Sequence, residues 1–208
     1  MPYVFGYGSL LNPGSAAKTL GRTLAAGDLL CTTLPGYRRS WTASSFIRSA
    51  NHGVVRPCQA LFLDLSSCQD PQCSCNGVAL QVTEQELAAL DIREMGYRRC
   101  TVELQLENGH VQPGYAYVMP DCCKQKQGVI PARYKRLIEE ALHNYSNDFV
   151  LRFWQTTLPS NAEVVEGEYV FENRAQNKAA GRSLGRDYEP LDKNLPVYPA
   201  IALHEPQH

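Results

Sequence analysis

The stretch FGYGSLLNPGS (residues 5–15) combines a strand end, a glycine-rich turn and a helix start. Residues 3–5 just before the turn are aromatic or β-branched and predict a short strand. Asn12 followed by Pro13 is typical of a helix N-terminus, and Gly21 is typical of the end of that helix. The N-terminus therefore predicts a strand, a loop and a helix in close succession.

The turn itself has two interpretations. Gly6 and Gly8 allow a close backbone approach, and the N–H groups before a helix can hold a carboxylate or a developing oxyanion. A tight turn with a purely structural role would have the same sequence. The stretch lacks the patterns of phosphate-binding loops, and Leu11 stands where a nucleophile elbow needs its second glycine.

Further along the chain, strand patterns come first and helix patterns come late. Strands are predicted over residues 28–35, 36–44, 60–65, 77–82, 98–106 and 114–119. Pro131 opens a helix with an apolar face, and Ser146 or Asn147 caps the next helix. This order predicts an α+β fold rather than a doubly wound parallel sheet.

Composition restricts the class of function. The 208 residues are 44% hydrophobic and 20% charged, with a formal net charge of -1. This balance supports a packed core and gives no electrostatic case for binding nucleic acid or an anionic membrane. Because the chain has no long apolar run and no secretory pattern at its start, we expect a cytoplasmic protein.

The segment TEQELAALDIREMGYRR (residues 83–99) predicts a capped helix. Thr83 and Glu86 form a capping box, and Gly96 is a natural stop. Leu87 marks the inward face, and Glu94 lies almost above it because seven residues make nearly two turns. Asp91 is expected on the same side as Glu94, whereas Glu84, Gln85 and Arg93 are expected to point elsewhere.

An acid on an apolar helix face has two explanations. Near the helix end, Glu94 could reach solvent or pair with Arg98 or Arg99, since buried carboxylates are usually paired. Alternatively, Glu94 is a general base, because a carboxylate in a partly apolar site has a raised pKa and can accept a proton near neutral pH.

These stretches together resemble the γ-glutamylcyclotransferase superfamily, most closely its ChaC-like branch. The resemblance covers roughly residues 3–150, and the matching motifs follow the order of the family. They are VFGYGSL (4–10), GYRRSW (36–41), GVAL (77–80), LDIREMGYRR (90–99) and YAYVM (115–119).

The resemblance implies a mixed β-barrel flanked by α-helices, with a cavity for a γ-glutamyl group. We expect this domain to span residues 1–158. From Leu158 onward the patterns weaken. Residues 159–208 are therefore expected to form a C-terminal extension that packs on the domain or is partly disordered.

The resemblance also assigns roles to residues. Glu94 takes the role of the general base, and Tyr117 matches a tyrosine that lines the pocket of the family. Arg39 and Trp41 match an element that we interpret as structural. The loop that holds the γ-glutamyl moiety through main-chain amides corresponds to Gly6, Tyr7, Gly8, Ser9 and Leu10.

The implied reaction is an internal cyclisation. The α-amine of the substrate attacks its own γ-carbonyl, which yields 5-oxoproline and releases the amine or peptide without a metal or organic cofactor. Leu11 and Asn12 follow the loop where ChaC-like chains usually carry an aromatic residue. The substrate therefore stays open between glutathione and another γ-glutamyl amide or peptide.

The cysteines suggest an alternative function. Cys68, Cys73 and Cys75 lie in a polar loop and lack the paired C-x2-C spacing of a confident zinc site. We expect free or redox-active thiols here rather than zinc or a disulfide. The alternative to the enzyme is a non-catalytic barrel-fold protein that binds thiols or zinc through this loop.

Overall fold

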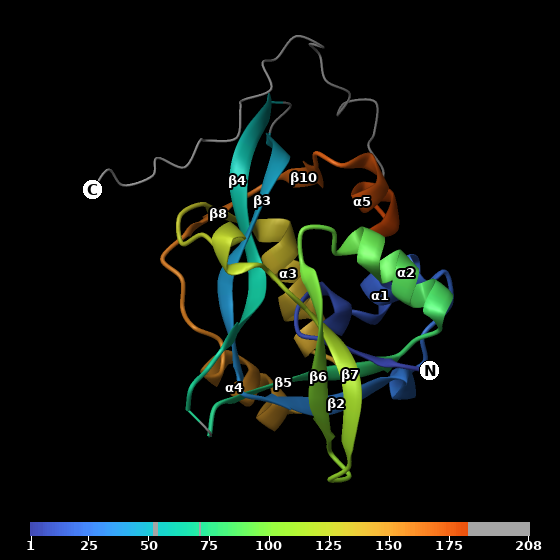
Figure 1. The fold of residues 1–208 in the computed structure, drawn as a ribbon. Coiled ribbons are helices and arrows are strands. Elements are labelled where there is room, and N and C mark those ends of the chain that lie inside the picture. The colour runs from blue at the N-terminus through green and yellow to red at the C-terminus, as the bar shows by residue number, and fades with distance from the viewer. Residues whose placement is uncertain (52–53, 71, 183–208) are drawn as a thin grey trace, which may run out of the picture.

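The computed structural model describes residues 1–51, 54–70 and 72–182 of the chain (Figure 1). Five strands form a closed barrel, in which the parallel pairing of β1 with β7 completes the ring. In barrel order they are β1 (Tyr3–Gly6), β5 (Ser74–Gln81), β2 (Leu29–Pro35), β6 (Arg98–Leu106) and β7 (Val111–Val118). The barrel and its flanking helices confirm the predicted α+β fold class.

A second sheet is built on a long antiparallel hairpin. β3 (Tyr37–Asn51) pairs with β4 (Val54–Ser67) along most of its length. Gly36, with a φ of 76°, makes the turn that carries the chain from β2 into β3 and so from the barrel to this sheet. The other strands of the sheet are β8 (Val129–Pro131), β9 (Glu163–Val165) and β10 (Glu168–Phe171).

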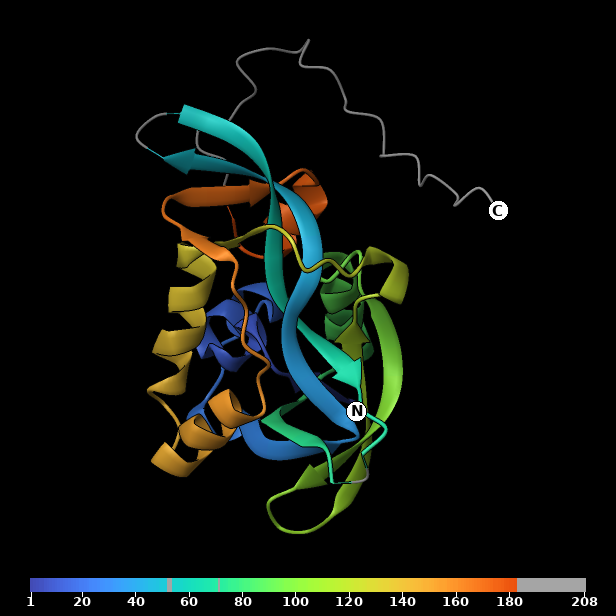
Figure 2. The same ribbon diagram turned by 90° about the vertical axis from the view of Figure 1, so that its left-hand side faces the viewer.

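The helices form two groups. α1 (Pro13–Leu20), α2 (Glu84–Arg93) and α5 (Arg174–Ala179) pack side by side (Figure 1). α3 (Ala132–Leu142) and α4 (Asn147–Gln155) lie together on one side of the β3–β4 hairpin (Figure 2). Short 3₁₀ helices are η1 (Ser9–Leu11), η2 (Ala26–Asp28) and η3 (Asp121–Cys123). None of these helices combines the length and apolar composition needed to cross a membrane.

The predicted caps at both ends of α1 and at the start of α2 are confirmed, whereas α2 ends at Arg93 with Glu94 as its C-cap rather than at Gly96. The side chain of Asn12 accepts a hydrogen bond from the Ser15 N–H at 2.9 Å at the start of α1, and Gly21 ends that helix with a φ of 67°. At the start of α2, Thr83 and Glu86 form a reciprocal capping box. These local signals fix both ends of α1 and the start of α2.

Arg39 is a fully buried cation in the core. Arg39 in β3 donates to the Phe153 carbonyl at 2.9 Å and to the Asn76 side chain at 3.1 Å, and its guanidinium stacks 3.6 Å above the Phe153 ring. Arg39 thereby joins β3, β5 and α4, which is a structural role.

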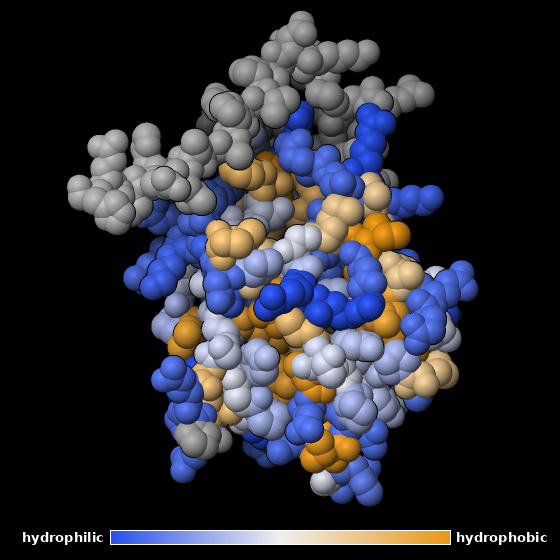
Figure 3. All heavy atoms as spheres, viewed as in Figure 1, coloured by the Kyte–Doolittle hydropathy of each residue, from blue (hydrophilic) through white to orange (hydrophobic). Residues whose placement is uncertain are grey.

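On the face drawn in Figure 3, hydrophobic residues form small separate patches among hydrophilic ones.

The C-terminal extension contributes to the fold. β10 pairs with β3, and β9 pairs with β8. Helix α5 is tied to α1 by the Thr19 hydroxyl, which donates to the Ala179 carbonyl at 2.7 Å, and to α2 by the Gln176 amide, which donates to the Arg93 carbonyl at 3.2 Å. Residues 183–208 of the predicted extension lie outside the described residues, and the boundary at residue 158 stays a prediction.

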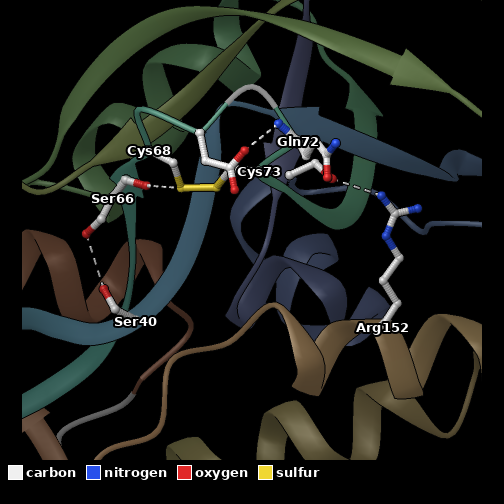
Figure 4. The surroundings of a disulfide bond; sticks show 8 residues. Ser40, Ser66, Cys68, Gln72, Cys73 and Arg152 are labelled. Carbon is white, nitrogen blue, oxygen red and sulfur yellow. Dashed lines mark hydrogen bonds between the residues drawn. A yellow bond between two sulfur atoms is a disulfide. The ribbon is translucent and has the colours of Figure 1, made fainter.

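The cysteine loop contains a disulfide between Cys68 and Cys73 (Figure 4). Cys75 is separate and fully buried in β5. The expectation of free thiols is therefore wrong for two of the three cysteines. Within the part of the chain that the structure describes, no three His, Cys, Asp or Glu side chains gather in a group that could hold a metal ion.

Candidate active site

A cavity of about 220 Å³ lies where the N-terminal loop, the end of α2, β7, α3 and the β10–α5 segment meet. Its lining includes Glu94, Tyr117 and the loop residues Tyr7, Gly8, Ser9 and Leu10. Residues far apart in the chain thus line one cavity. The sequence-predicted residues are together, with one exception.

The exception is Gly6, which does not line the cavity. It belongs to β1 and pairs with Val78 of β5. A Cβ at this position would lie 2.9 Å from the Val78 side chain and 3.0 Å from Leu10 Cβ. Gly6 therefore permits the close packing of β1 on β5 beneath the loop.

The loop presents unpaired backbone donors. The Leu11 N–H donates to the Gly8 carbonyl at 2.9 Å, which closes the turn. Among the described residues, the N–H groups of Tyr7, Gly8, Ser9 and Leu10 have no hydrogen-bond acceptor. Successive free N–H groups that border a cavity form an anion-binding concavity. The opening stretch thus has free backbone donors beside the cavity, and its role in ligand binding stays a prediction.

Glu94 is the C-cap of α2 and faces the same cavity. Its side chain is only 18% exposed, and its carboxylate pairs with Arg93 Nε at 3.0 Å. Burial raises the pKa of Glu94 above its ordinary value of 4.5, and the charge of Arg93 partly opposes this rise. Pairing with Arg99 does not occur, because Arg99 contacts Asp91 at 2.6 Å. The Glu94 carboxylate therefore lies at the cavity, paired with Arg93 rather than with Arg99.

Arg93 corrects the expectation that its side chain points away from the inward face. It is buried, and its guanidinium donates to Ser9 Oγ at 2.8 Å, to Ser15 Oγ at 2.9 Å and to Thr19 Oγ1 at 2.6 Å. Helix α1 packs on this side of α2 and supplies Ser15 and Thr19, and η1 supplies Ser9. Arg93 therefore connects the loop to Glu94.

Tyr117 lines the cavity, but its hydroxyl is already in use. The hydroxyl donates to Asp91 Oδ1 at 2.7 Å, and the Tyr117 carbonyl accepts a hydrogen bond from the Tyr7 hydroxyl at 2.5 Å. Burial and the bond to Asp91 raise the pKa of Tyr117, so that its hydroxyl stays protonated at neutral pH. Its contribution to the cavity is mainly the ring.

Sequence reasoning missed an aromatic wall. Tyr134 from α3 stands edge-on to Phe62 of β4 at 4.9 Å, and Tyr169 of β10 lies 5.7 Å from Phe62. Tyr134 also approaches the loop, because a Cβ on Gly8 would lie 2.7 Å from its hydroxyl oxygen. The sequence indicated Tyr134 only as one apolar position of a helix, and nothing in the pattern indicated Tyr169.

The comparison with protein families identifies the class of protein. Residues 4–139 match the family described as gamma-glutamyl cyclotransferase, AIG2-like. The chain belongs to this family, and the match confirms the superfamily inferred from the motifs. The match does not test the ChaC-like branch, which stays a prediction.

Solved structures support the fold. An uncharacterized protein from Homo sapiens has 14% identity and a TM-score of 0.56, with 80% of this chain and 93% of that chain covered. A structure named gamma-glutamyl cyclotransferase has 14% identity and a TM-score of 0.52, with 79% and 93% covered.

A solution structure from Arabidopsis thaliana has 29% identity and a TM-score of 0.39. The match covers 57% of this chain and 61% of the Arabidopsis chain. A comparison with curated proteins gave no match.

Proposed function

We propose that this protein cyclises a γ-glutamyl substrate to 5-oxoproline, with Glu94 as the general base. The observation that carries the proposal is the cavity shared by a buried carboxylate and a row of free backbone N–H groups. The family to which the chain belongs supports the same class of activity. In this proposal the protein is a γ-glutamylcyclotransferase-type enzyme.

The reaction requires one bond to form and one to break. The substrate α-amine attacks the γ-carbonyl carbon, and Glu94 accepts the proton that the amine loses. The γ-amide bond then breaks, and the proton passes to the departing amine. The attacking and attacked groups belong to one molecule, so that much of the rate enhancement comes from holding the substrate in a folded conformation.

The negative charge on the γ-carbonyl oxygen needs hydrogen-bond donors. The N–H groups of the Tyr7–Leu10 loop are suited to this role, because no protein acceptor in the described residues competes for them. The hydroxyl of Tyr117 is less suited, since it donates to Asp91. The loop is therefore proposed as both the holder of the γ-glutamyl group and the source of oxyanion stabilisation.

The elevated pKa of Glu94 suits this chemistry. Burial brings the carboxylate closer in proton affinity to the amine that it must deprotonate, while Arg93 keeps it ionised over part of the acidic range. Proton transfer to a matched base typically contributes about 10²- to 10⁴-fold in rate. Glutathione and other γ-glutamyl amides or peptides are the candidate substrates.

The test is a substrate screen with the full-length protein. Glutathione, γ-glutamyl dipeptides and γ-glutamyl amines are incubated separately, and 5-oxoproline and the released amine are quantified by mass spectrometry. We expect the two products in equal amounts from at least one substrate. The absence of 5-oxoproline from every compound, with the protein folded, would contradict the proposal.

A further inference from the structure

A second cation lines the cavity and comes from outside the segment that the family match covers. Arg182 follows α5, whereas the match ends at residue 139. Its Nη1 donates to the Tyr169 carbonyl at 3.2 Å, and its Nη2 donates to the Tyr169 hydroxyl. The guanidinium lies 3.8 Å from the centre of the Tyr169 ring. These contacts fix its position in the cavity wall.

The charge of Arg182 has no acidic partner in residues 1–51, 54–70 and 72–182. Its Nε is buried and lacks an acceptor. Burial lowers the pKa of Arg182, and the nearby Arg133 and Arg93 add to this effect. Because a buried charge is costly unless paired, an anion that enters the cavity would be stabilised here.

Arg182 and the loop contact different residues of the aromatic wall. Tyr134 borders Gly8, Phe62 lies between Tyr134 and Tyr169, and Arg182 stacks on Tyr169. A carboxylate held by the loop would therefore lie near Tyr134, whereas the guanidinium lies against Tyr169. The two positions suit two different anionic groups of one ligand.

The balance of charge in the cavity lining also favours a ligand with two anionic groups. Glu94 is paired with Arg93, which leaves the charge of Arg182 uncompensated within the described cavity lining. A γ-glutamyl group carries one α-amine and one α-carboxylate and is neutral overall at pH 7. A second carboxylate on the departing amine would supply the missing negative charge.

We propose that Arg182 binds a carboxylate of the leaving group and makes the protein selective for γ-glutamyl amino acids or peptides over γ-glutamyl derivatives of uncharged amines. This inference rests on the proposed function. It assigns Arg182 as a specificity-determining residue supplied by the C-terminal segment.

The test compares two substrates that differ in one charge. γ-Glutamylalanine ends in a carboxylate, and γ-glutamylalaninamide has the same shape with a neutral end. We expect the wild-type protein to prefer the carboxylate in kcat/KM by about 10- to 100-fold, as is typical of a hydrogen bond to a charged group. In Arg182→Met this ratio should fall close to one, and Arg182→Lys should retain part of it.

Two control variants separate recognition from folding. Arg136→Met removes an exposed arginine that pairs with Glu166 outside the cavity, and it should keep the wild-type ratio. Tyr169→Phe removes the hydroxyl that anchors Arg182 but keeps the guanidinium, so that a preference for the carboxylate should persist. Equal preference in wild type and Arg182→Met would overturn the inference and leave the proposed function intact.

If the proposed function is wrong, the wild-type protein turns over neither compound. The wild-type protein is then titrated with each compound by isothermal calorimetry. Tighter binding of γ-glutamylalanine that is lost in Arg182→Met would still support the role of Arg182. Equal binding of the two compounds, or no binding of either, would overturn it.

Discussion

Arg93 Nη2 donates to Ser9 Oγ at 2.8 Å, which joins residues 84 positions apart in the chain. The same guanidinium pairs with Glu94 through Nε at 3.0 Å. One buried side chain thus fixes the loop that carries the backbone donors relative to the carboxylate. Arg93 is a positioning residue in the proposed mechanism, and its two contacts lead to the first prediction.

Replacing Arg93 should change the pH dependence of the reaction. The base acts as a carboxylate, so that activity falls as pH drops through the pKa of Glu94. Burial already raises this pKa, and Arg93 lowers it. In Arg93→Met the pKa should rise further, and the acid limb of kcat/KM against pH should move to higher pH.

The conservative variant Arg93→Lys keeps the charge and should move the acid limb less than Arg93→Met. Arg98→Met, which changes an exposed arginine at the start of β6, is the matched control. Thermal unfolding of each variant reports any structural loss separately. An acid limb at the same pH in Arg93→Met and wild type would show that Arg93 does not tune the base.

A methyl group on Gly8 should obstruct the loop. The Cβ of Gly8→Ala would lie 2.7 Å from the Tyr134 hydroxyl oxygen, which is closer than real contacts allow. We expect kcat/KM to fall about tenfold or more, because a shift of the loop misplaces the substrate. The double variant Gly8→Ala/Tyr134→Phe removes the clashing oxygen and should recover part of the loss.

Gly27→Ala is the control for this experiment, since its Cβ would have no neighbour within 4 Å. It should leave kcat/KM close to the wild-type value. If the double variant were no more active than the product of its two single effects, the clash with Tyr134 would not be the cause.

Loss of the Tyr117 hydroxyl should affect stability more than catalysis. Tyr117→Phe removes a hydrogen bond to the Asp91 carboxylate, and such bonds contribute about 1.5–3 kcal/mol. We expect a lower free energy of unfolding and a loss in kcat of less than about tenfold. A fall in kcat of about 100-fold or more would instead support the hydroxyl as an oxyanion donor.

The disulfide loop should be dispensable for turnover. Cys68 and Cys73 do not line the cavity. With a sequence separation of 5, their cross-link closes a short loop, and its loss in Cys68→Ser/Cys73→Ser should lower stability by about 2 kcal/mol. Formation of 5-oxoproline should continue at the wild-type rate.

Unchanged turnover in this variant would argue against the alternative function, a barrel-fold thiol or zinc-binding protein. Elemental analysis of the wild-type protein provides the second measurement. Stoichiometric zinc that is lost in the double variant, together with no cyclotransferase activity, would support the alternative instead.

Local sequence signals predicted the parts of the site that depend only on residues close together in the sequence. Asn12 and Gly21 bound α1, and Thr83 starts α2, because capping needs only neighbouring backbone groups. The periodicity of α2 placed Glu94 on the inward side. These elements place the loop and Glu94 at the cavity, which is why both positions could be predicted from sequence.

The missed residues depend on long-range packing. The Arg93 side chain points toward the hydroxyls of Ser15 and Thr19 in α1. The apolar periodicity of α2 carries no information about these acceptors. Tyr169 and Arg182 reach the cavity only because β10, with four residues, pairs with the distant β3. So short a strand has no periodicity that sequence reasoning can detect.

The most direct measurement of the central claim is the rate of 5-oxoproline release by Glu94→Gln. This variant keeps the size of the side chain and removes its capacity to accept a proton. Glu84→Gln, at an exposed position of the same helix, is the matched control. We predict a loss of about 100-fold or more in kcat for Glu94→Gln, with Tm near the wild-type value, and unchanged turnover for Glu84→Gln. Turnover by folded Glu94→Gln at the wild-type rate would contradict the assignment of Glu94 as the base.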